Sequence, residues 1–170
     1  MDTSGFEIRE WPVLRKPAMV VGLGGWGNAL NVAKGTAAYL VRRMEASLFG
    51  TLRMDKFFRF DERRPTVNIQ NGLMESVQFS RGGLFAVKQP DRDRDVVLIV
   101  TEEPHLCWEA FAEQLINVAR ITDTSEFISL GSLYDGVLHT EALISGFAGS
   151  AVHLEELAAL GIRPVTYQGP

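Results

Sequence analysis

The chain has 170 residues, 46% of them hydrophobic and 22% charged, an ordinary composition for a globular protein with a sizeable core. Its net charge of −4 argues against nucleic acid or an anionic membrane as a partner, because both require a basic surface. No apolar run approaches the ~18 residues of a membrane span, and the single cysteine, Cys107, fits a reducing compartment. We therefore expect a cytoplasmic protein that folds as one α/β domain over residues 1–170.

The most informative unit of the sequence predicts a strand, a glycine turn and a helix in succession. Ala18–Leu23 is wholly apolar, which is typical of a strand buried on both faces of a sheet. The loop Gly22–Gly27 permits a sharp turn, and Asn28 is suited to cap a helix over Ala29–Met44. Gly35 lies inside that helix, where glycine is unfavourable, so we expect it to mark close packing against the sheet.

The middle of the chain changes from a helical to a strand-like pattern. Ala46–Met54 predicts a second strand, parallel to the first. Asn71-Gly72 is a strong hairpin signal between Thr66–Gln70 and Glu75–Phe79, and Leu84–Lys88 follows as a third strand. We expect these three to form an antiparallel meander at an edge of the sheet.

The last part of the chain returns to alternating strands and helices. Val96–Thr101 predicts another buried strand, and apolar residues at helical spacing from Trp108 to Ala119 predict an amphipathic helix. Charged residues 91–95 predict a solvated turn. The remaining predicted elements are strands at Glu126–Leu130, Ala142–Phe147 and Val165–Tyr167, and a helix at Ala151–Leu160 with Ser150 as N-cap and Gly161 after its end. The whole pattern predicts a mostly parallel sheet with flanking helices and an inserted antiparallel meander.

A candidate ligand crevice follows from this topology. Ligands of open α/β sheets bind beyond the carboxyl ends of the parallel strands. The polar and glycine residues expected there are Gly24, Gly25, Trp26, Asn28, Glu102, Glu103, Ser132, His139 and Thr140.

None of these residues forms a sharp catalytic signature. The glycines match the dinucleotide pattern G-x-G-x-x-G, but bulky Trp26 precedes the last of them and no acidic residue ends the second strand. Glu102 and Glu103 are adjacent on a strand, so their side chains diverge and do not form an acid–base pair. His105 and Cys107 do not project together as metal ligands would. We therefore predict no catalytic residue, no metal and no cofactor.

A cluster of aromatic residues, Phe57, Phe58 and Phe60, lies among charges of both signs. Local packing in a loop is one interpretation of this cluster. The other is a subunit interface, because aromatic residues and arginine are enriched there.

The sequence also resembles the proteasome assembly chaperone family, including its archaeal and actinobacterial members. The resemblance spans essentially the whole chain and rests on these motifs: Pro17-Ala18 leading into the loop at 22–28, Asn71-Gly72, Glu102-Glu103-Pro104, Leu130-Gly131, His139-Thr140 and Tyr167-Gln168-Gly169-Pro170. It implies an α/β sandwich similar to nucleoside phosphorylases, self-association (a trimer is one form), and in eukaryotic relatives the escort of proteasome α-subunits. Chains of this family usually continue past the Gly-Pro with further helices, which implies a short member or a fragment.

Two functions remain open at this point. The first is a non-catalytic assembly or interaction protein with protein partners. The second is a small-ligand-binding enzyme, nucleosidase-like or of the carboxylate–amine ligase type that some bacterial members are labelled with, using Glu102, Glu103, Ser132 and His139 in the crevice.

Overall fold

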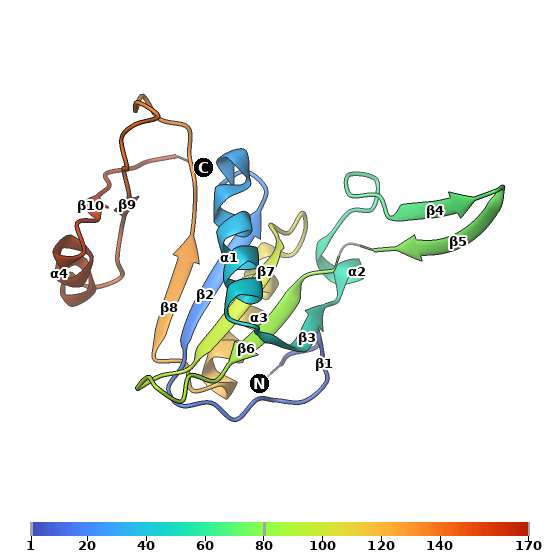
Figure 1. The fold of residues 1–170 in the computed structure, drawn as a ribbon, viewed down its shortest axis with the longest axis horizontal. Coiled ribbons are helices and arrows are strands. Elements are labelled where there is room, and N and C mark those ends of the chain that lie inside the picture. Colours follow the sequence, from blue (N-terminus) through green and yellow to red (C-terminus); the bar gives the residue numbers. More distant parts are fainter. Residues whose placement is uncertain (1, 80, 170) are drawn as a thin grey trace. The chain divides into compact units, whose positions relative to one another are not determined.

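The computed structural model describes residues 2–79 and 81–169. The chain divides into two compact units, residues 1–133 and residues 134–170 (Figure 1). The single domain expected from the sequence stays a prediction, and each unit is described by itself.

A six-stranded sheet forms the centre of the first unit. Its strands are β1 (Phe6–Ile8), β2 (Ala18–Gly24), β3 (Ser47–Leu52), β6 (Gly83–Val87), β7 (Val96–Glu102) and β8 (Glu126–Leu130), in the spatial order β1-β3-β6-β7-β2-β8. β2 pairs in parallel with both β7 and β8, whereas the pairings β1–β3, β3–β6 and β6–β7 are antiparallel.

The sheet is therefore mixed, which corrects the prediction of a mostly parallel sheet. β3 does run in the same direction as β2, but β6 and β7 lie between them, and β6 runs the opposite way. Two of the antiparallel pairings, β3–β6 and β6–β7, follow from the insertion of β6 into the interior of the sheet.

The predicted meander is wrong in its third strand. β4 (Thr66–Gln70) and β5 (Leu73–Gln78) form a separate two-stranded ribbon, with the predicted turn at Asn71 (φ 51°) and Gly72 (φ 80°). β6 pairs in the main sheet and not with this ribbon, because its residues are apolar on both faces and Leu84 is fully buried. A strand of that kind is stable only where other layers cover both of its faces.

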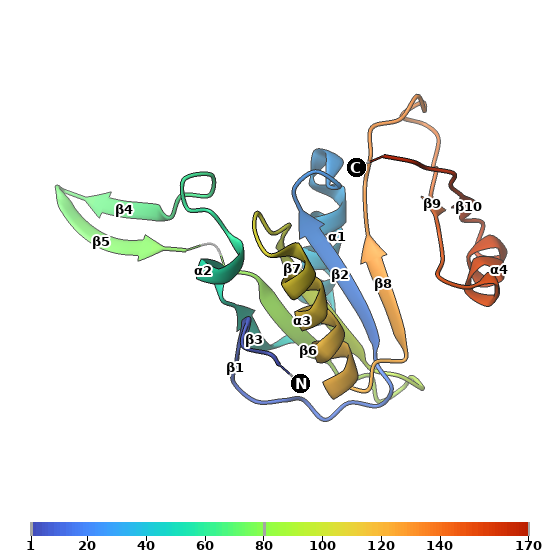
Figure 2. The same cartoon turned by 180° about the vertical axis from the view of Figure 1, so that it is seen from behind.

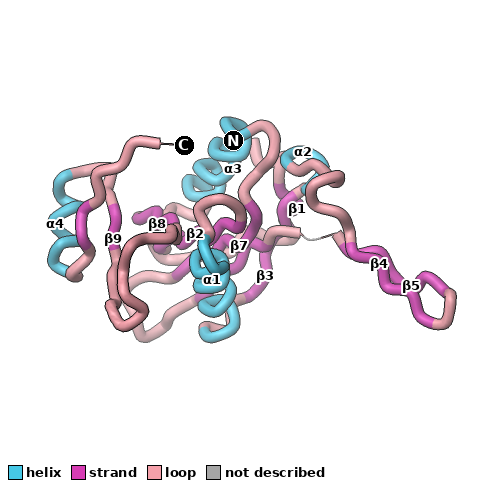
Figure 3. Tube along the Cα trace, turned by 90° about the horizontal axis from the view of Figure 1, so that it is seen from above, coloured by secondary structure: helices cyan, strands magenta, loops and turns pink. Residues whose placement is uncertain are grey.

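Two helices cover the two faces of the sheet. α1 (Val32–Arg43) lies on one side and α3 (Trp108–Ile121) on the other, as Figures 2 and 3 show, and α2 (Met54–Phe57) is a single turn after β3. The main core lies on the α3 side, where Met19 and Val21 of β2 pack with Phe111, Leu115 and Val118. In the described part of the chain, no helix has the length and apolar character needed to cross a membrane.

Close packing between α1 and the sheet occurs at a glycine of the strand. A Cβ on Gly22 would lie 2.4 Å from the Cβ of Ala37 and 2.9 Å from the carbonyl oxygen of Ala33. A Cβ on Gly35 would meet only the side chain of Asn31, at 3.5 Å. The prediction that Gly35 marks the close approach is therefore wrong, and Gly22 has that role.

α1 begins later than the sequence predicts. Ala29–Asn31 forms a short irregular turn, η1, in which Leu30 and Asn31 have left-handed backbone angles (φ 52° and 58°). These angles are incompatible with a right-handed helix, so the α-helix starts only at Val32. Asn28 nevertheless acts at the helix start, because its Oδ1 accepts the amide hydrogen of Lys34 at 3.0 Å.

The second unit contains β9 (Ser145–Gly146), α4 (Ala151–Ala159) and β10 (Arg163–Pro164). Ser150 caps α4 as predicted, accepting from the amide of His153 at 3.3 Å, and Gly161 has the expected positive φ of 75°. Of the two strands expected near the end of the chain, the one at Ala142–Phe147 is reduced to β9. The one expected at Val165–Tyr167 is wrong, because those residues form no strand and β10 precedes them. β9 and β10 pair in parallel.

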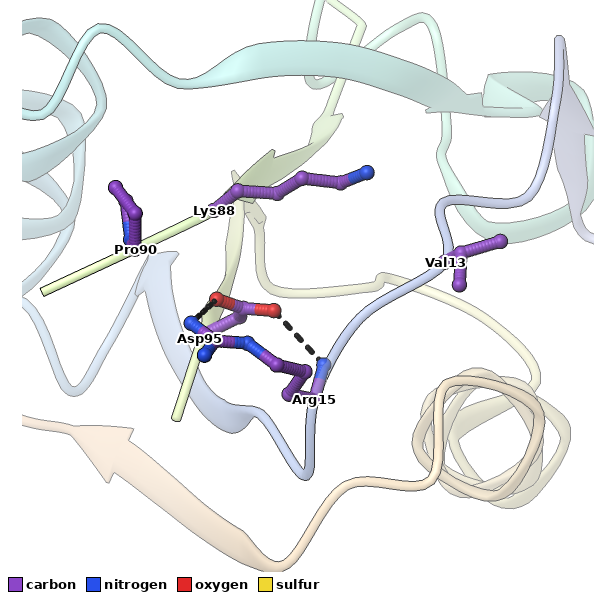
Figure 4. Close-up of a pocket in the computed structure, with 5 residues that line it drawn as sticks. All are labelled: Val13, Arg15, Lys88, Pro90 and Asp95. Atoms are coloured by element: carbon purple, nitrogen blue, oxygen red, sulfur yellow. Dashed lines mark hydrogen bonds and ion pairs between the residues drawn. The ribbon is translucent and has the colours of Figure 1, made fainter. Parts of the chain in front are cut away.

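The charged segment before β7 is only partly solvated. Residues 91–94 are exposed, but Asp95 is buried, with 2% of its surface accessible. Burial acts to raise the pKa of Asp95, but hydrogen bonds from the Arg15 side chain and from the backbone amides of Gln89 and Arg15 outweigh it and lower the pKa to about 2. Figure 4 shows Arg15 and Asp95 in a pocket of about 450 Å³ that Val13, Lys88 and Pro90 also line.

Candidate functional site

The carboxyl ends of β2 and β7 bring the glycine loop and the two glutamates together. Gly24 and Glu102 are register partners in the parallel pairing, and the amide of Glu103 donates to the carbonyl of Gly24 at 3.0 Å. The sequence predicted this juxtaposition because an apolar strand precedes each of the two motifs.

The two carboxylates lie directly against the two glycines. A Cβ on Gly24 would lie 1.7 Å from Oε2 of Glu102, and a Cβ on Gly25, which has φ +108°, would lie 2.1 Å from Oε2 of Glu103. The amide of Trp26 donates to the same Glu103 oxygen at 2.7 Å. The loop thus cradles an anionic group, and that group is a side chain of the protein itself.

Glu102 has partners different from those of Glu103. Its Oε1 forms ion pairs with Nζ of Lys34, from α1, and with Nη1 of Arg63 at 2.7 Å. Glu102 is only 17% exposed, and two cations from different elements compensate its charge. The two carboxylates therefore serve separate contacts.

Ser132 fastens the glycine loop from the neighbouring strand end. Its amide donates to the carbonyl of Gly27 (2.9 Å), its carbonyl accepts from the amide of Ala29 (3.1 Å), and its hydroxyl donates to the carbonyl of Ala29 (3.0 Å). Ser132 also forms an isolated β-bridge with Asn28. Its role is therefore to hold the glycine loop in place, which the sequence analysis did not predict.

His139 and Thr140 lie in the second unit, in an exposed turn that precedes β9. Their placement in the crevice stays a prediction.

The pocket at this end of the sheet has a volume of about 580 Å³. It contains four of the predicted residues, namely Gly25, Trp26, Glu102 and Glu103. Its other lining residues, which the sequence analysis did not assign to it, are Arg59, Glu62, Arg63, Pro104, His105, Leu106 and Trp108.

The missed residues come from the segment after α2 and from the start of α3. His105 joins the two, because its Nδ1 accepts the amide hydrogen of Arg59 at 3.0 Å. Arg59 also forms a hydrogen bond to Asp61 and holds the pKa of that carboxyl below its ordinary value. The sequence shows the charges of this segment but gives no signal for the long-range contact that places them beside Glu102.

Two of the three aromatic residues predicted for an interface are part of the core. Phe57 and Phe58 are 2% and 3% exposed, and the ring of Phe57 packs edge-to-face on Phe111 at 5.5 Å between centroids. Only Phe60, at 38% exposed, reaches the surface, where it packs edge-to-face on Phe79. Phe57 and Phe58 are thus buried within this chain, and Phe57 packs on a residue distant in sequence, which differs from local packing in a loop. The interface expected at Phe57, Phe58 and Phe60 stays a prediction.

Two tryptophan side chains remain exposed at the pocket. Trp26 is 62% exposed and Trp108 is 52% exposed, although large aromatic residues are usually covered in a folded chain. The arrangement thus combines charges that have partners within the chain with exposed indole rings, which are typical anchors of protein interfaces.

Comparison with known proteins agrees with this architecture. The sequence profile of the PAC2 family matches residues 19–170. The chain belongs to the PAC2 family. This confirms the resemblance to proteasome assembly chaperones, since a proteasome-assembly chaperone homologue of Mycobacterium tuberculosis is similar in structure to this PAC2 chain, with a TM-score of 0.79 and 25% identity over 90% of this chain and 64% of that one.

Other solved structures extend the comparison. A PAC2 family protein of Streptomyces avermitilis is similar with a TM-score of 0.78 and 25% identity, over 91% of this chain and 65% of that chain. An archaeal proteasome activator, PbaB of Pyrococcus furiosus, shares the fold at 17% identity, with a TM-score of 0.72 over 96% of this chain and 66% of that chain. The PAC2 chain spans about 65% of the length of these relatives. No curated protein matches it.

Proposed function

We propose that this PAC2 chain is a non-catalytic assembly factor that binds protein partners, with the rim of the strand-end pocket as one contact surface. The names of its structural relatives point to subunits of the proteasome as the partner, and α-subunits are the class that the family resemblance implies. The proposal includes a cytoplasmic location, where such a partner would be met.

One observation carries the proposal. The amide of Trp26, which could hold the phosphate or carboxylate of a small ligand, donates to Glu103 instead. A small anionic ligand would have to displace a carboxylate that is already fitted to the loop. The exposed rings of Trp26 and Trp108 offer a protein partner the kind of surface that carries binding energy.

Binding to purified proteasome α-subunits of the source organism tests the proposal. Trp26→Ala and Trp108→Ala are each expected to raise the dissociation constant about tenfold or more, the usual effect of truncating an aromatic anchor. Tyr39→Ala is the matched control, because Tyr39 is 54% exposed on α1 and does not line the pocket. No measurable binding of the wild type, or equal loss in all three variants, would contradict the proposal.

The alternative function, a small-ligand enzyme of nucleosidase or ligase type, has a separate test. A nucleotide, nucleoside or amino acid present at about 100 times its dissociation constant would stabilise the protein by about 2.7 kcal/mol. Thermal shift measurements with these three classes are expected to give no such stabilisation. A shift that disappears in Gly25→Val would favour the enzyme over the assembly factor.

A further inference from the structure

The strand-end pocket, at the carboxyl ends of β2 and β7, contains a carboxylate that no cation of the described chain neutralises. The charged groups of its lining are three carboxylates and two guanidinium groups, those of Glu62, Glu102, Glu103, Arg59 and Arg63. Both guanidinium groups are engaged, because Arg63 pairs with Glu102 at 2.7 Å and Arg59 pairs with Glu62 at 2.9 Å. Within residues 2–79 and 81–169, Glu103 forms no ion pair.

The outer members of this network do not change the balance. Lys34 is a second cation at Glu102, and Asp61 is a second acid at Arg59. These two charges have opposite signs and cancel each other. The negative charge that remains at the pocket is therefore that of Glu103.

The other groups close to Glu103 supply no net positive charge. His105 is uncharged in this arrangement, because its Nδ1 accepts the amide hydrogen of Arg59 and so carries no proton. The start of α3 adds a partial positive charge, which Glu109 in the first turn of that helix offsets. The hydrogen bond that Glu103 accepts comes from an uncharged donor, the amide of Trp26.

The two exposed indole rings line the same pocket as this carboxylate. Trp26 and Trp108 both have more than half of their surface exposed. The face of an indole ring attracts cations more strongly than the face of any other aromatic side chain. The cavity of about 580 Å³ is in the size range of pockets that enclose small ligands, so a whole side chain can enter it.

The carboxylate and the rings together select among possible occupants. An apolar side chain would remove water from the Glu103 carboxylate without replacing its hydrogen bonds, which costs free energy. A phosphate or carboxylate would be repelled by the same group. A cationic side chain gains from both features, and a guanidinium suits them better than an ammonium, because it is more weakly hydrated and stacks flat on aromatic rings.

We propose that the strand-end pocket binds an arginine side chain of the protein partner, through the indole faces of Trp26 and Trp108 and the carboxylate of Glu103. The inference rests on the proposed assembly function, since it names the chemistry by which that function recognises its partner. The net charge of −4 on this chain also attracts a partner surface that presents arginine.

The test uses a tripeptide of sequence Ala-Arg-Ala with blocked ends, titrated into the millimolar range against the full chain. NMR follows the indole N–H signals of the three tryptophans, each assigned by replacing one tryptophan with phenylalanine. The signals of Trp26 and Trp108 are expected to shift and to saturate. The signal of Trp11, which packs on Phe49 and does not line the pocket, is expected to stay in place.

Two further peptides separate charge from shape. Citrulline has the shape of arginine without its charge, so the peptide Ala-citrulline-Ala is expected to bind about tenfold more weakly or less. The peptide Ala-Glu-Ala is expected to shift neither signal. Equal binding of the arginine and citrulline peptides, or stronger binding of the glutamate peptide, would overturn the proposal.

A pair of variants locates the charge that matters. Glu103→Gln keeps the size of the side chain and an oxygen that accepts from the Trp26 amide, so its circular dichroism is expected to match the wild type. The dissociation constant of the arginine peptide is expected to rise about tenfold. Glu113→Gln removes the same charge from an exposed position of α3 outside the pocket and is expected to change it by less than about twofold.

The outcomes also distinguish this inference from the assembly function. No shift with the arginine peptide, or equal effects of Glu103→Gln and Glu113→Gln, would overturn the arginine site. Proteasome α-subunits that bind Glu103→Gln as tightly as the wild type, yet lose affinity for Trp26→Ala, would overturn the arginine site and leave the assembly function standing. Binding of the arginine peptide without any binding of α-subunits would instead contradict the assembly function alone.

Discussion

Gly22 offers the sharpest test of how this fold is held together. Replacing it with alanine places a methyl group 2.4 Å from the Cβ of Ala37, where ordinary carbon–carbon contacts are about 3.5–4.0 Å. The carbonyl oxygen of Ala33, a backbone atom that cannot rotate away, would lie at 2.9 Å. α1 must therefore move by about 1 Å, and overpacking of this kind costs about 1–3 kcal/mol.

Urea denaturation measures the loss in the free energy of unfolding, and thermal denaturation should show it as a fall of about 2–4 °C per kcal/mol. Gly35→Ala is the matched control, because a methyl group there meets nothing closer than 3.5 Å. It is expected to stabilise the protein by about 0.5–1 kcal/mol, since alanine is the better helix former.

A double-mutant cycle separates the clash from other effects. Ala37→Gly alone loses a buried methyl group and helix propensity, yet combined with Gly22→Ala it removes the closest contact. The double variant should therefore be more stable than the sum of the two single effects by about 1 kcal/mol or more. Additive effects, or Gly35→Ala being the more damaging glycine substitution, would refute the packing described for α1.

Three further predictions concern single sites. Asp95 has a pKa of about 2 in the folded protein, against 3.8 as its ordinary value. Its ionised carboxylate therefore stabilises the fold above pH 4, and this stabilisation is lost as the pH falls towards 2. In urea titrations at decreasing pH, the unfolding free energy of Asp95→Asn should fall by about 2 kcal/mol less than that of the wild type. Gly25→Ala should cost about 1–3 kcal/mol through its positive φ and the Glu103 contact, whereas Gly27→Ala, with open space around it, should change the unfolding free energy by less than about 0.5 kcal/mol. Ser132→Ala should cost about 1 kcal/mol by removing its hydrogen bond to the Ala29 carbonyl, and an unchanged melting temperature would exclude that role.

Local patterns in the sequence were sufficient for most elements of the fold. The spacing of Trp108, Phe111 and Leu115 placed α3, and the all-apolar runs placed β2 and β7 in the buried sheet. Asn71-Gly72 located its turn because the positive φ of both positions restricts the residue types that fit. Each of these signals is contained within a few consecutive residues.

The failures that matter most for the fold concern contacts between distant residues. β6 follows the ribbon in sequence but pairs with β3 and β7. This pairing buries both faces of β6, and its five residues do not indicate which strands will be its neighbours. Phe57 and Phe58 lie among charged residues, yet both are buried, and the ring of Phe57 packs on Phe111 of α3. Gly22 was assigned to the strand and to the turn but not to the contact with α1, since the sequence does not tell which glycine faces Ala37.

At the candidate site, the sequence predicted that the glycine loop and the two glutamates lie together. It did not predict that the loop binds the carboxylate of Glu103. Which anion the loop holds depends on where the Glu103 side chain turns, which no local pattern encodes. The second wall of the pocket, with Arg59 and Trp108, depends on the contact between the segment after α2 and the start of α3.

The order of the strands also has a consequence for synthesis on the ribosome. β2 is completed early, but its two neighbours begin at Val96 and Glu126, so both of its edges stay without partners while most of the first unit is translated. At about 5–20 residues per second, the nascent chain carries this apolar segment for on the order of 5–20 seconds before the sheet can close around it. Slower translation between Arg43 and Val96 should therefore increase aggregation of the newborn protein, although the finished fold would be the same.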